Sequence, residues 1–216
     1  MLNNRLVFNL GATLYDLFTS QNTWWNHCRN LTPRDAGPES ILDVGCGPGI
    51  SAFALEEKHP EARIVGLDLA EKMIRRAQNT KRELGSDVEF LIGNAEGLPF
   101  PDDSFEWVTG HSFLYLLENR HDVLSDVHRV LEPGGSVTFL EPRKNPGFGW
   151  VIPSVGKGFR FFTTMIGWQI FSGLHGRFEE IDLQELLTEA GFESVSCQQT
   201  LNGLGWICRA QSDEFS

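Results

Sequence analysis

Positive charge is scarce in this chain of 216 residues, which carries 18 Lys and Arg against 29 Asp and Glu and a formal net charge of −11. A field of that sign repels phosphate backbones, so we do not expect nucleic acid as a partner. One basic cluster, at Arg75, Arg76, Lys81 and Arg82, falls on a predicted helix, where a solvent-exposed face is the simpler interpretation.

Cysteine and long apolar runs are scarce as well. Cys28, Cys46, Cys197 and Cys208 contain no C-x-x-C pair, so the spacing indicates neither a metal site nor a disulfide framework. We therefore expect reduced thiols, no bound metal and a cytoplasmic protein. No apolar run reaches 18 residues, and the N-terminus lacks the basic-then-apolar order of a signal peptide, so we expect no membrane span.

The middle of the chain alternates short apolar runs with helical patterns, which is typical of βαβ units. Strands are predicted at 41–44, 63–67, 88–92, 107–110 and 136–140, and helices at 51–58, 70–84 and 121–131. The residues 132–135, Glu-Pro-Gly-Gly, predict a turn between the last helix and its strand. A further helix is predicted at 181–190 and two more strands at 192–198 and 205–210, joined by a hairpin connection at 199–203.

These elements predict an α/β fold with a Rossmann-like, doubly wound sheet of seven strands. The sheet should be mostly parallel, end in a C-terminal antiparallel hairpin and carry helices on both faces. The length fits a single domain over residues 1–216. We divide it into an N-terminal helical cap (1–40), a cofactor-binding core (41–142), a substrate-side insertion or lid (143–180) and a C-terminal helix and hairpin (181–216).

A glycine-rich loop, Asp43–Gly49, lies where the first strand ends and a helix begins. Glycines let a backbone approach a ligand closely, and a helix N-terminus offers free N–H groups. Residues 47–52 also satisfy the dinucleotide fingerprint G-x-G-x-x-A, and a tight turn without a ligand is a third interpretation. Asp43 would oppose a pyrophosphate but would favour the cationic groups of S-adenosylmethionine.

Two further polar positions follow the next two predicted strands. Asp68 lies 19 residues after Gly49, where a carboxylate can accept hydrogen bonds from both ribose hydroxyls of an adenosine or can cap the next helix. The segment Gly93–Phe100 follows the third strand, where Asn94 can accept from an adenine amino group and the Ala95 N–H can donate to a ring nitrogen. A loop capped by Asn94 is the alternative.

Taken together, these motifs resemble those of class I S-adenosylmethionine-dependent methyltransferases, especially the branch that includes ubiquinone and menaquinone biosynthesis enzymes. Ile41–Gly49 is similar to the family's first motif, Gly66–Asp68 to its ribose-binding acid, Gly93–Phe105 to its adenine segment and Arg129–Gly135 to the turn before strand five. The resemblance covers about residues 40–142 and implies S-adenosylmethionine as the methyl donor. It implies these cofactor-binding residues: Asp43, Gly45, Cys46, Gly47, Gly49, Asp68, Leu69, Met73, Asn94, Ala95, Glu96 and His111.

The chain departs from the family pattern at two places. Asn94 stands where the family usually has Asp, which keeps an acceptor and loses a charge. Many relatives have paired histidines after strand four, whereas Tyr115 and Leu116 occupy those positions here. A catalytic role of those histidines therefore does not carry over.

Methyl transfer to an oxygen or carbon acid requires a base in addition to alignment of the reactants. The candidates are His111, Tyr115, Tyr15 and His175. His111 is the best placed, because it follows strand four at the cofactor edge, and we expect His111 and Tyr115 to be catalytic. A binding or packing role is the simpler interpretation of His111. His175 lies between glycines on the insertion, where it can belong to a lid or simply to the surface.

Aromatic residues crowd the two segments that flank the core, so we expect a small apolar or aromatic acceptor such as a quinol, a phenol or a lipid. Packing of a roof over the site is the alternative, and residues 159–171 can also lie on a membrane surface as an amphipathic helix. A non-catalytic cofactor-binding partner subunit and a nicotinamide-dependent oxidoreductase are the competing functions. The aromatic residues are Trp24, Trp25, Phe148, Trp150, Phe159, Phe161, Phe162, Trp168 and Phe171.

Overall fold

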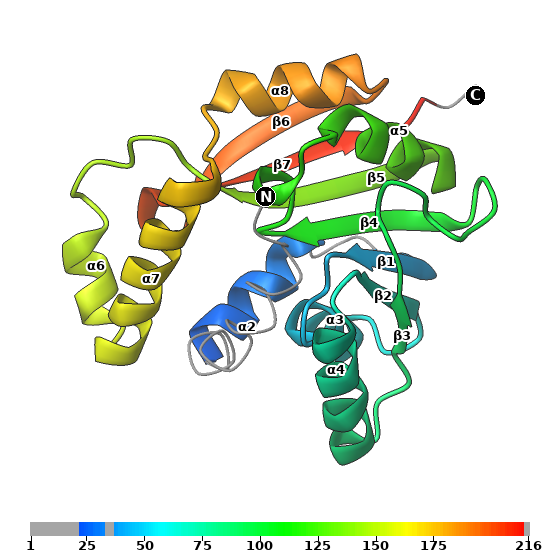
Figure 1. Ribbon diagram of the computed structural model, residues 1–216, viewed down its shortest axis with the longest axis horizontal. Coiled ribbons are helices and arrows are strands. Elements are labelled where there is room, and N and C mark those ends of the chain that lie inside the picture. The colour runs from blue at the N-terminus through cyan, green and yellow to red at the C-terminus, as the bar shows by residue number, and fades with distance from the viewer. Residues whose placement is uncertain (1–21, 33–36, 214–216) are drawn as a thin grey trace.

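A computed structural model describes residues 22–32 and 37–213, with helices on both sides of a single seven-stranded sheet (Figure 1). The strand order is β3-β2-β1-β4-β5-β7-β6. The pairs from β3 to β5 are parallel, and β7 runs antiparallel to both β5 and β6, as predicted. The strands are β1 (Ser40–Val44), β2 (Arg63–Asp68), β3 (Glu89–Ile92), β4 (Phe105–His111), β5 (Leu131–Pro142), β6 (Glu193–Thr200) and β7 (Gly205–Gln211).

Each face of the sheet carries its own apolar core, because successive strand residues point to opposite sides. In β1, Leu42 and Val44 belong to the core that includes Val123 and Leu183, whereas Ile41 belongs to the other core. The first core lies under α5 (Arg120–Val130) and α8 (Glu180–Glu189). The second packs against α2 (Asn22–Cys28), α3 (Ile50–Lys58), α4 (Glu71–Leu84) and the inner side of α7 (Phe159–His175).

The segment predicted as a turn at 132–135 lies inside β5, which begins at Leu131. Leu131 pairs with Phe105 and Ser136 pairs with Trp107, so β5 carries three more residues than β4 over this stretch. Gly134 adopts a φ of 73°, as a bulge of this kind requires. Gly134 and Gly135 therefore form a bulge within β5, and the predicted turn before this strand is wrong.

Both flanks of the core are helical where they are described. The α2 helix and a 3₁₀ turn, η1 (Arg29–Leu31), precede β1, and Tyr15 lies outside the described residues. The insertion forms α6 (Val151–Gly156) and α7, which stand together off one end of the sheet (Figure 1). No helix in the described ranges is long and apolar enough to cross a membrane.

The expectation of four reduced thiols is wrong, because Cys197 and Cys208 form a disulfide. The two residues face each other directly in the antiparallel β6–β7 pair, with Cα atoms 4.1 Å apart. Only the strand register reveals this pairing, since the cysteines are 11 residues apart and belong to no spacing motif. Cys28 and Cys46 are free and buried.

Candidate functional site

The glycine loop after β1 is shaped by backbone conformations that favour glycine. Gly45, Gly47 and Gly49 have φ values of 70°, 55° and 88°. The N–H groups of Gly45 and Cys46 donate to the Leu67 carbonyl at 2.8 and 3.1 Å, which ties the loop to the end of β2. A Cβ atom at Gly45 would lie 2.5 Å from the Phe113 ring, so no larger residue fits without a shift of that ring.

Asp43 lies beneath this loop with its carboxylate fully buried. One oxygen accepts a hydrogen bond from the Ser51 hydroxyl in the first turn of α3, and the other accepts from the Thr109 hydroxyl on β4 at 3.2 Å. Burial raises the pKa of Asp43 to about 7, although both hydroxyl bonds act in the opposite direction. Asp43 thus connects β1, β4 and α3, and the predicted effect of its charge on the ligand stays a prediction.

Asp68, at the end of β2, connects two loops at the carboxyl edge of the sheet. Its Oδ2 accepts from the Gly47 N–H at 2.9 Å and its Oδ1 from the Ala70 N–H at 2.7 Å. The helix-cap alternative does not apply, because the N-cap of α4 is Ala70 and has no side-chain cap. Burial raises the pKa of Asp68, against the effect of the two N–H bonds.

The residues around Asp68 fit an adenosine. A carboxylate has about four acceptor positions, so the two N–H bonds leave positions for ribose hydroxyls. Leu69, which follows directly, is 46% exposed, and Ile92, which pairs with Asp68 in the sheet, is 55% exposed. These side chains offer apolar surface to a purine, and Met73 is buried on the first turn of α4 behind them.

The segment after β3 hydrogen-bonds to itself in the manner of the Asn-capped alternative. The Asn94 Oδ1 accepts from the Glu96 N–H at 3.2 Å, and its Nδ2 donates to the Glu96 carboxylate at 3.3 Å. The other oxygen of Glu96 accepts from Asn119 at 3.3 Å. Ala95 is buried. An adenine amino group would have to share the Asn94 oxygen with this loop.

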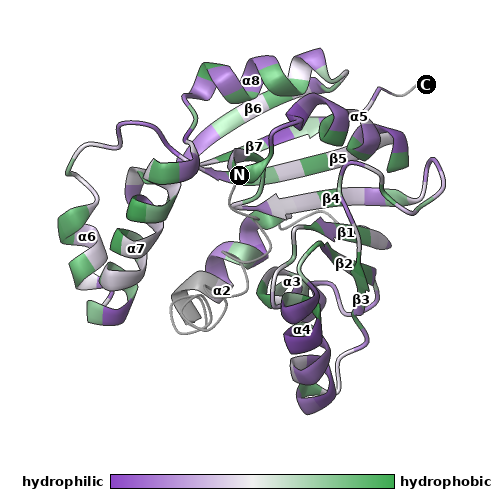
Figure 2. Ribbon diagram, in the orientation of Figure 1, coloured by the Kyte–Doolittle hydropathy of each residue, from purple (hydrophilic) through white to green (hydrophobic). Residues whose placement is uncertain are grey.

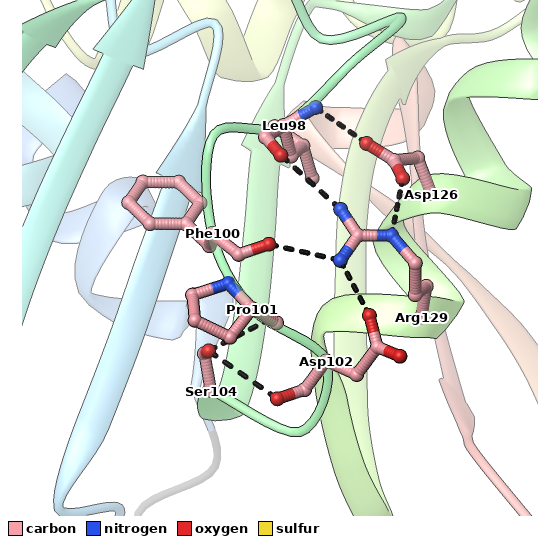
Figure 3. A network of polar contacts seen from close by, with 7 residues as sticks. All are labelled: Leu98, Phe100, Pro101, Asp102, Ser104, Asp126 and Arg129. Carbon is pink, nitrogen blue, oxygen red and sulfur yellow. Dashed lines mark hydrogen bonds and ion pairs between the residues drawn. The ribbon is translucent and has the colours of Figure 1, made fainter.

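Arg129 on α5 holds the rest of the segment in place (Figure 3). Its guanidinium donates to the carbonyls of Leu98 and Phe100 at 3.1 and 2.9 Å and pairs with Asp102 at 2.7 Å and with Asp126 at 2.6 Å. Asp126 also accepts from the Leu98 N–H. Burial alone would raise the pKa of Asp126, but the Arg129 and Leu98 bonds leave it below its ordinary value. This network joins two of the sequence motifs.

His111, the last residue of β4, lies at a small cavity beside the glycine loop. Burial lowers its pKa to about 4, and the charge of nearby His27 adds to the effect. Burial and the charge of Lys157 lower the pKa of His27 to about 4 as well. Both imidazoles are therefore neutral at pH 7. The cavity is lined by Cys28, Gly45, Cys46, Pro48, Ile50, Ser51 and His111.

The loop after His111 is organised by the buried carboxylate of Glu141 on β5. It accepts from the N–H groups of Phe113, Leu114 and Tyr115 at 3.0, 2.8 and 3.3 Å. Burial raises the pKa of Glu141 to about 7, against the pull of these bonds. The Glu141 carboxylate therefore binds the protein's own backbone. It does not pair with Arg143, which instead contacts Gln199, the Gly203 carbonyl and the Trp206 ring.

The structure separates the remaining base candidates from His111. The Tyr115 side chain is 3% exposed, belongs to the core and meets the Phe171 ring edge-on at 6.3 Å, so its catalytic role stays a prediction. His175 is exposed at the last turn of α7, where its Nδ1 lies 2.9 Å from the Phe171 carbonyl oxygen. Neither side chain lines the cavity at His111.

Several residues of the site carried no signal in the sequence. His27 and Cys28 lie in a helix of the N-terminal cap, and only the fold brings them to the end of β4. Ser51 and Thr109 bind Asp43 from elements that are far apart in the chain. The three N–H groups that converge on Glu141 belong to a loop whose conformation the sequence does not show.

Comparison with known proteins identifies the family of the chain. A family model described as a methyltransferase domain matches residues 41–135. The ubiquinone/menaquinone biosynthesis C-methyltransferase UbiE of Desulfotalea psychrophila is 30% identical over 91% of this chain and 85% of that protein. The demethylmenaquinone methyltransferase of Lactococcus lactis is 35% identical over 89% of this chain and 83% of that protein.

The fold also matches a solved structure, a putative methyltransferase in complex with the Trm112 methyltransferase activator of Haloferax volcanii. The two chains superpose with a TM-score of 0.72 at 19% identity, over 95% of this chain and 97% of the other. That likeness shows the fold, and the sequence relatives show the family. The chain belongs to the class I S-adenosylmethionine-dependent methyltransferases and uses S-adenosylmethionine as its methyl donor.

Proposed function

We propose that this methyltransferase acts on a small apolar or aromatic acceptor of the quinol, phenol or lipid-like class. Of the relatives named above, one is a ubiquinone/menaquinone biosynthesis C-methyltransferase and the other a demethylmenaquinone methyltransferase. The observation that carries the proposal is the position of the inner aromatic side chains of α7. The Trp168 indole donates to the Ser112 hydroxyl at 3.0 Å, and Ser112 directly follows His111.

An aromatic wall therefore stands next to the cavity residue His111. Phe171, one turn after Trp168, packs edge-on against Tyr115 in the same loop. Phe161, near the start of α7, is buried in the second core, the one that packs against α2, α3 and α4. Acceptor pockets with apolar and aromatic walls and few polar groups suit flat, uncharged molecules.

The chain's own residues supply alignment and a base. S-adenosylmethionine, when bound, provides an electrophilic methyl group on its sulfonium. His111 is a neutral imidazole of low pKa, so we assign it a base role only during the transfer itself, when the acceptor oxygen becomes strongly acidic as it gains the methyl group. Glu141 holds the 113–115 backbone, which keeps His111 and Ser112 in place beside the glycine loop.

A non-catalytic cofactor-binding subunit is the second candidate. One observation favours it: the histidine pair of many relatives is replaced by Tyr115 and Leu116. In that arrangement this chain would act together with a partner subunit.

Methylation assays with radiolabelled S-adenosylmethionine test the proposal. We expect label in a short-chain naphthoquinol or a phenol, and none in RNA or in sugar phosphates. Label only in polar acceptors would refute the apolar acceptor class. Tight binding of S-adenosylmethionine in calorimetry without transfer to any acceptor would favour the non-catalytic subunit instead.

A further inference from the structure

Residues 142–178 differ in charge from the rest of the chain. This segment holds Arg143, Lys144, Lys157, Arg160 and Arg177 and no Asp or Glu, in a chain with 29 acidic residues. Its formal charge is +5, so the remainder carries −16, since −11 − 5 = −16. Lys144 pairs with Glu179 just beyond the segment. Lys157 and Arg160 are exposed at the α6–α7 junction, and the Lys157 ammonium lies 5.2 Å from the centre of the Phe161 ring.

The same segment exposes large apolar side chains. Figure 2 shows hydrophobic residues along α6 and α7, which project away from the sheet. Phe148, Ile152 and Phe159 are 88%, 84% and 81% exposed. Single exposed apolar residues are ordinary, but a contiguous group is typical of an interaction surface. We call this group, together with Lys157 and Arg160, the α6–α7 face: Phe148, Ile152, Val155, Phe159, Ile170 and Leu174.

The exposure is not a consequence of loose packing of α7, because the helix has two distinct apolar sides. Phe161 and Met165 are buried against the core. Phe159, Ile170 and Leu174 share the opposite side, since residues 11 and 4 positions apart lie on one stripe of a helix. An open hollow of about 390 Å³ lies on this outer side and is lined by Trp150, Ile166, Gln169, Ile170, Gly173 and Arg177.

We propose that the α6–α7 face docks on the surface of an anionic lipid bilayer. Exposed apolar side chains can enter the boundary between headgroups and acyl chains, while Lys157 and Arg160 lie at the level of the lipid phosphates. Such basic residues bind anionic leaflets, whereas the acidic remainder of the molecule is repelled. The charge asymmetry therefore selects this face and sets the orientation of the bound protein. The hollow beside Trp150 is open to an acyl chain.

Docking in this orientation would bring a membrane-dissolved acceptor to the helix whose inner side contacts the site. The Trp168 indole reaches Ser112 from the same helix that carries Ile170 and Leu174 on its outer side. This consequence rests on the proposed function, whereas the docking itself rests only on charge and exposure.

Flotation of the full chain with lipid vesicles tests the proposal. We expect at least tenfold tighter binding to vesicles that contain phosphatidylglycerol than to pure phosphatidylcholine, and weaker binding at high salt. The double variants Lys157→Glu/Arg160→Glu and Ile170→Glu/Leu174→Glu should each lose at least tenfold in affinity. The matched variant Arg82→Glu/Leu84→Glu, with exposed residues on α4, should bind like the wild type.

Three results would overturn the docking proposal. The first is that the protein floats with neither kind of vesicle, and the second is that the α4 variant loses as much vesicle affinity as the α6–α7 variants. The third is a dimer in sedimentation that the Ile170→Glu/Leu174→Glu variant abolishes, because this result would assign the face to a second copy of the chain. Calorimetry with S-adenosylmethionine verifies that each variant is folded. Methylation of a water-soluble phenol separates the two proposals: loss of vesicle binding with unchanged transfer leaves the acceptor class standing.

Discussion

The cofactor edge of the sheet and the α6–α7 segment are built in opposite ways. At the cofactor edge, backbone groups and buried carboxylates determine the shape: Asp68 binds the Gly47 and Ala70 N–H groups, and Asp43 binds two hydroxyls. The α7 helix instead reaches the site through side chains, chiefly Trp168 and Phe171. A backbone-built region tolerates few changes, whereas a wall of side chains can be altered to suit different acceptors.

The largest effect is expected for Gly45→Ala. The new Cβ would meet the Phe113 ring at 2.5 Å in a backbone with a φ of 70°, so overpacking and strain should together lower the free energy of unfolding by about 2–4 kcal/mol. Cofactor affinity should fall with it. Gly85→Ala is the control, because Gly85 has a φ of 67° and open space around it, and it should cost only about 1 kcal/mol. Thermal unfolding that ranks the two variants equally would contradict the crowding of the loop.

His111→Ala should lower turnover by about 100-fold with an unchanged dissociation constant for S-adenosylmethionine, as expected for a general base. His175→Ala, on the exposed end of α7, should keep wild-type turnover. Because the pKa of His111 is about 4, the wild-type rate should not fall through loss of this base between pH 8 and pH 5. A His111→Ala variant that loses only cofactor affinity would instead assign the imidazole to binding.

Asp43→Asn should change how stability depends on pH. The pKa of Asp43 is about 7 in the folded protein and near 4 when unfolded, so the folded state binds more protons between these values. Wild-type stability should therefore fall relative to the variant as pH rises, by about 2 kcal/mol from pH 5 to pH 7. Urea unfolding across this range measures the difference. A constant difference would show that Asp43 is ionised throughout.

The sequence predicts the cofactor edge far better than the acceptor side. Alternating apolar runs and glycine positions such as Gly47 and Gly49 act locally, so the strand order and the loop follow from short windows of residues. His27 reaches His111 only through the packing of α2, and the Cys197–Cys208 bond depends on the register of two strands. Nor does periodicity distinguish the buried side of α7 from its exposed side, because both are apolar.

The most direct test compares Asp68→Ala with Trp168→Phe in two measurements, calorimetry with S-adenosylmethionine and the KM for the acceptor that is labelled. Asp68→Ala should weaken cofactor binding by about tenfold or more, through lost hydrogen bonds to a charged group, and leave the acceptor KM nearly unchanged. Trp168→Phe should raise the acceptor KM a few-fold, through loss of the Ser112 hydrogen bond, with unaltered cofactor affinity. Changes of both quantities in both variants would contradict the separation of a backbone-built cofactor edge from a side-chain-built acceptor wall.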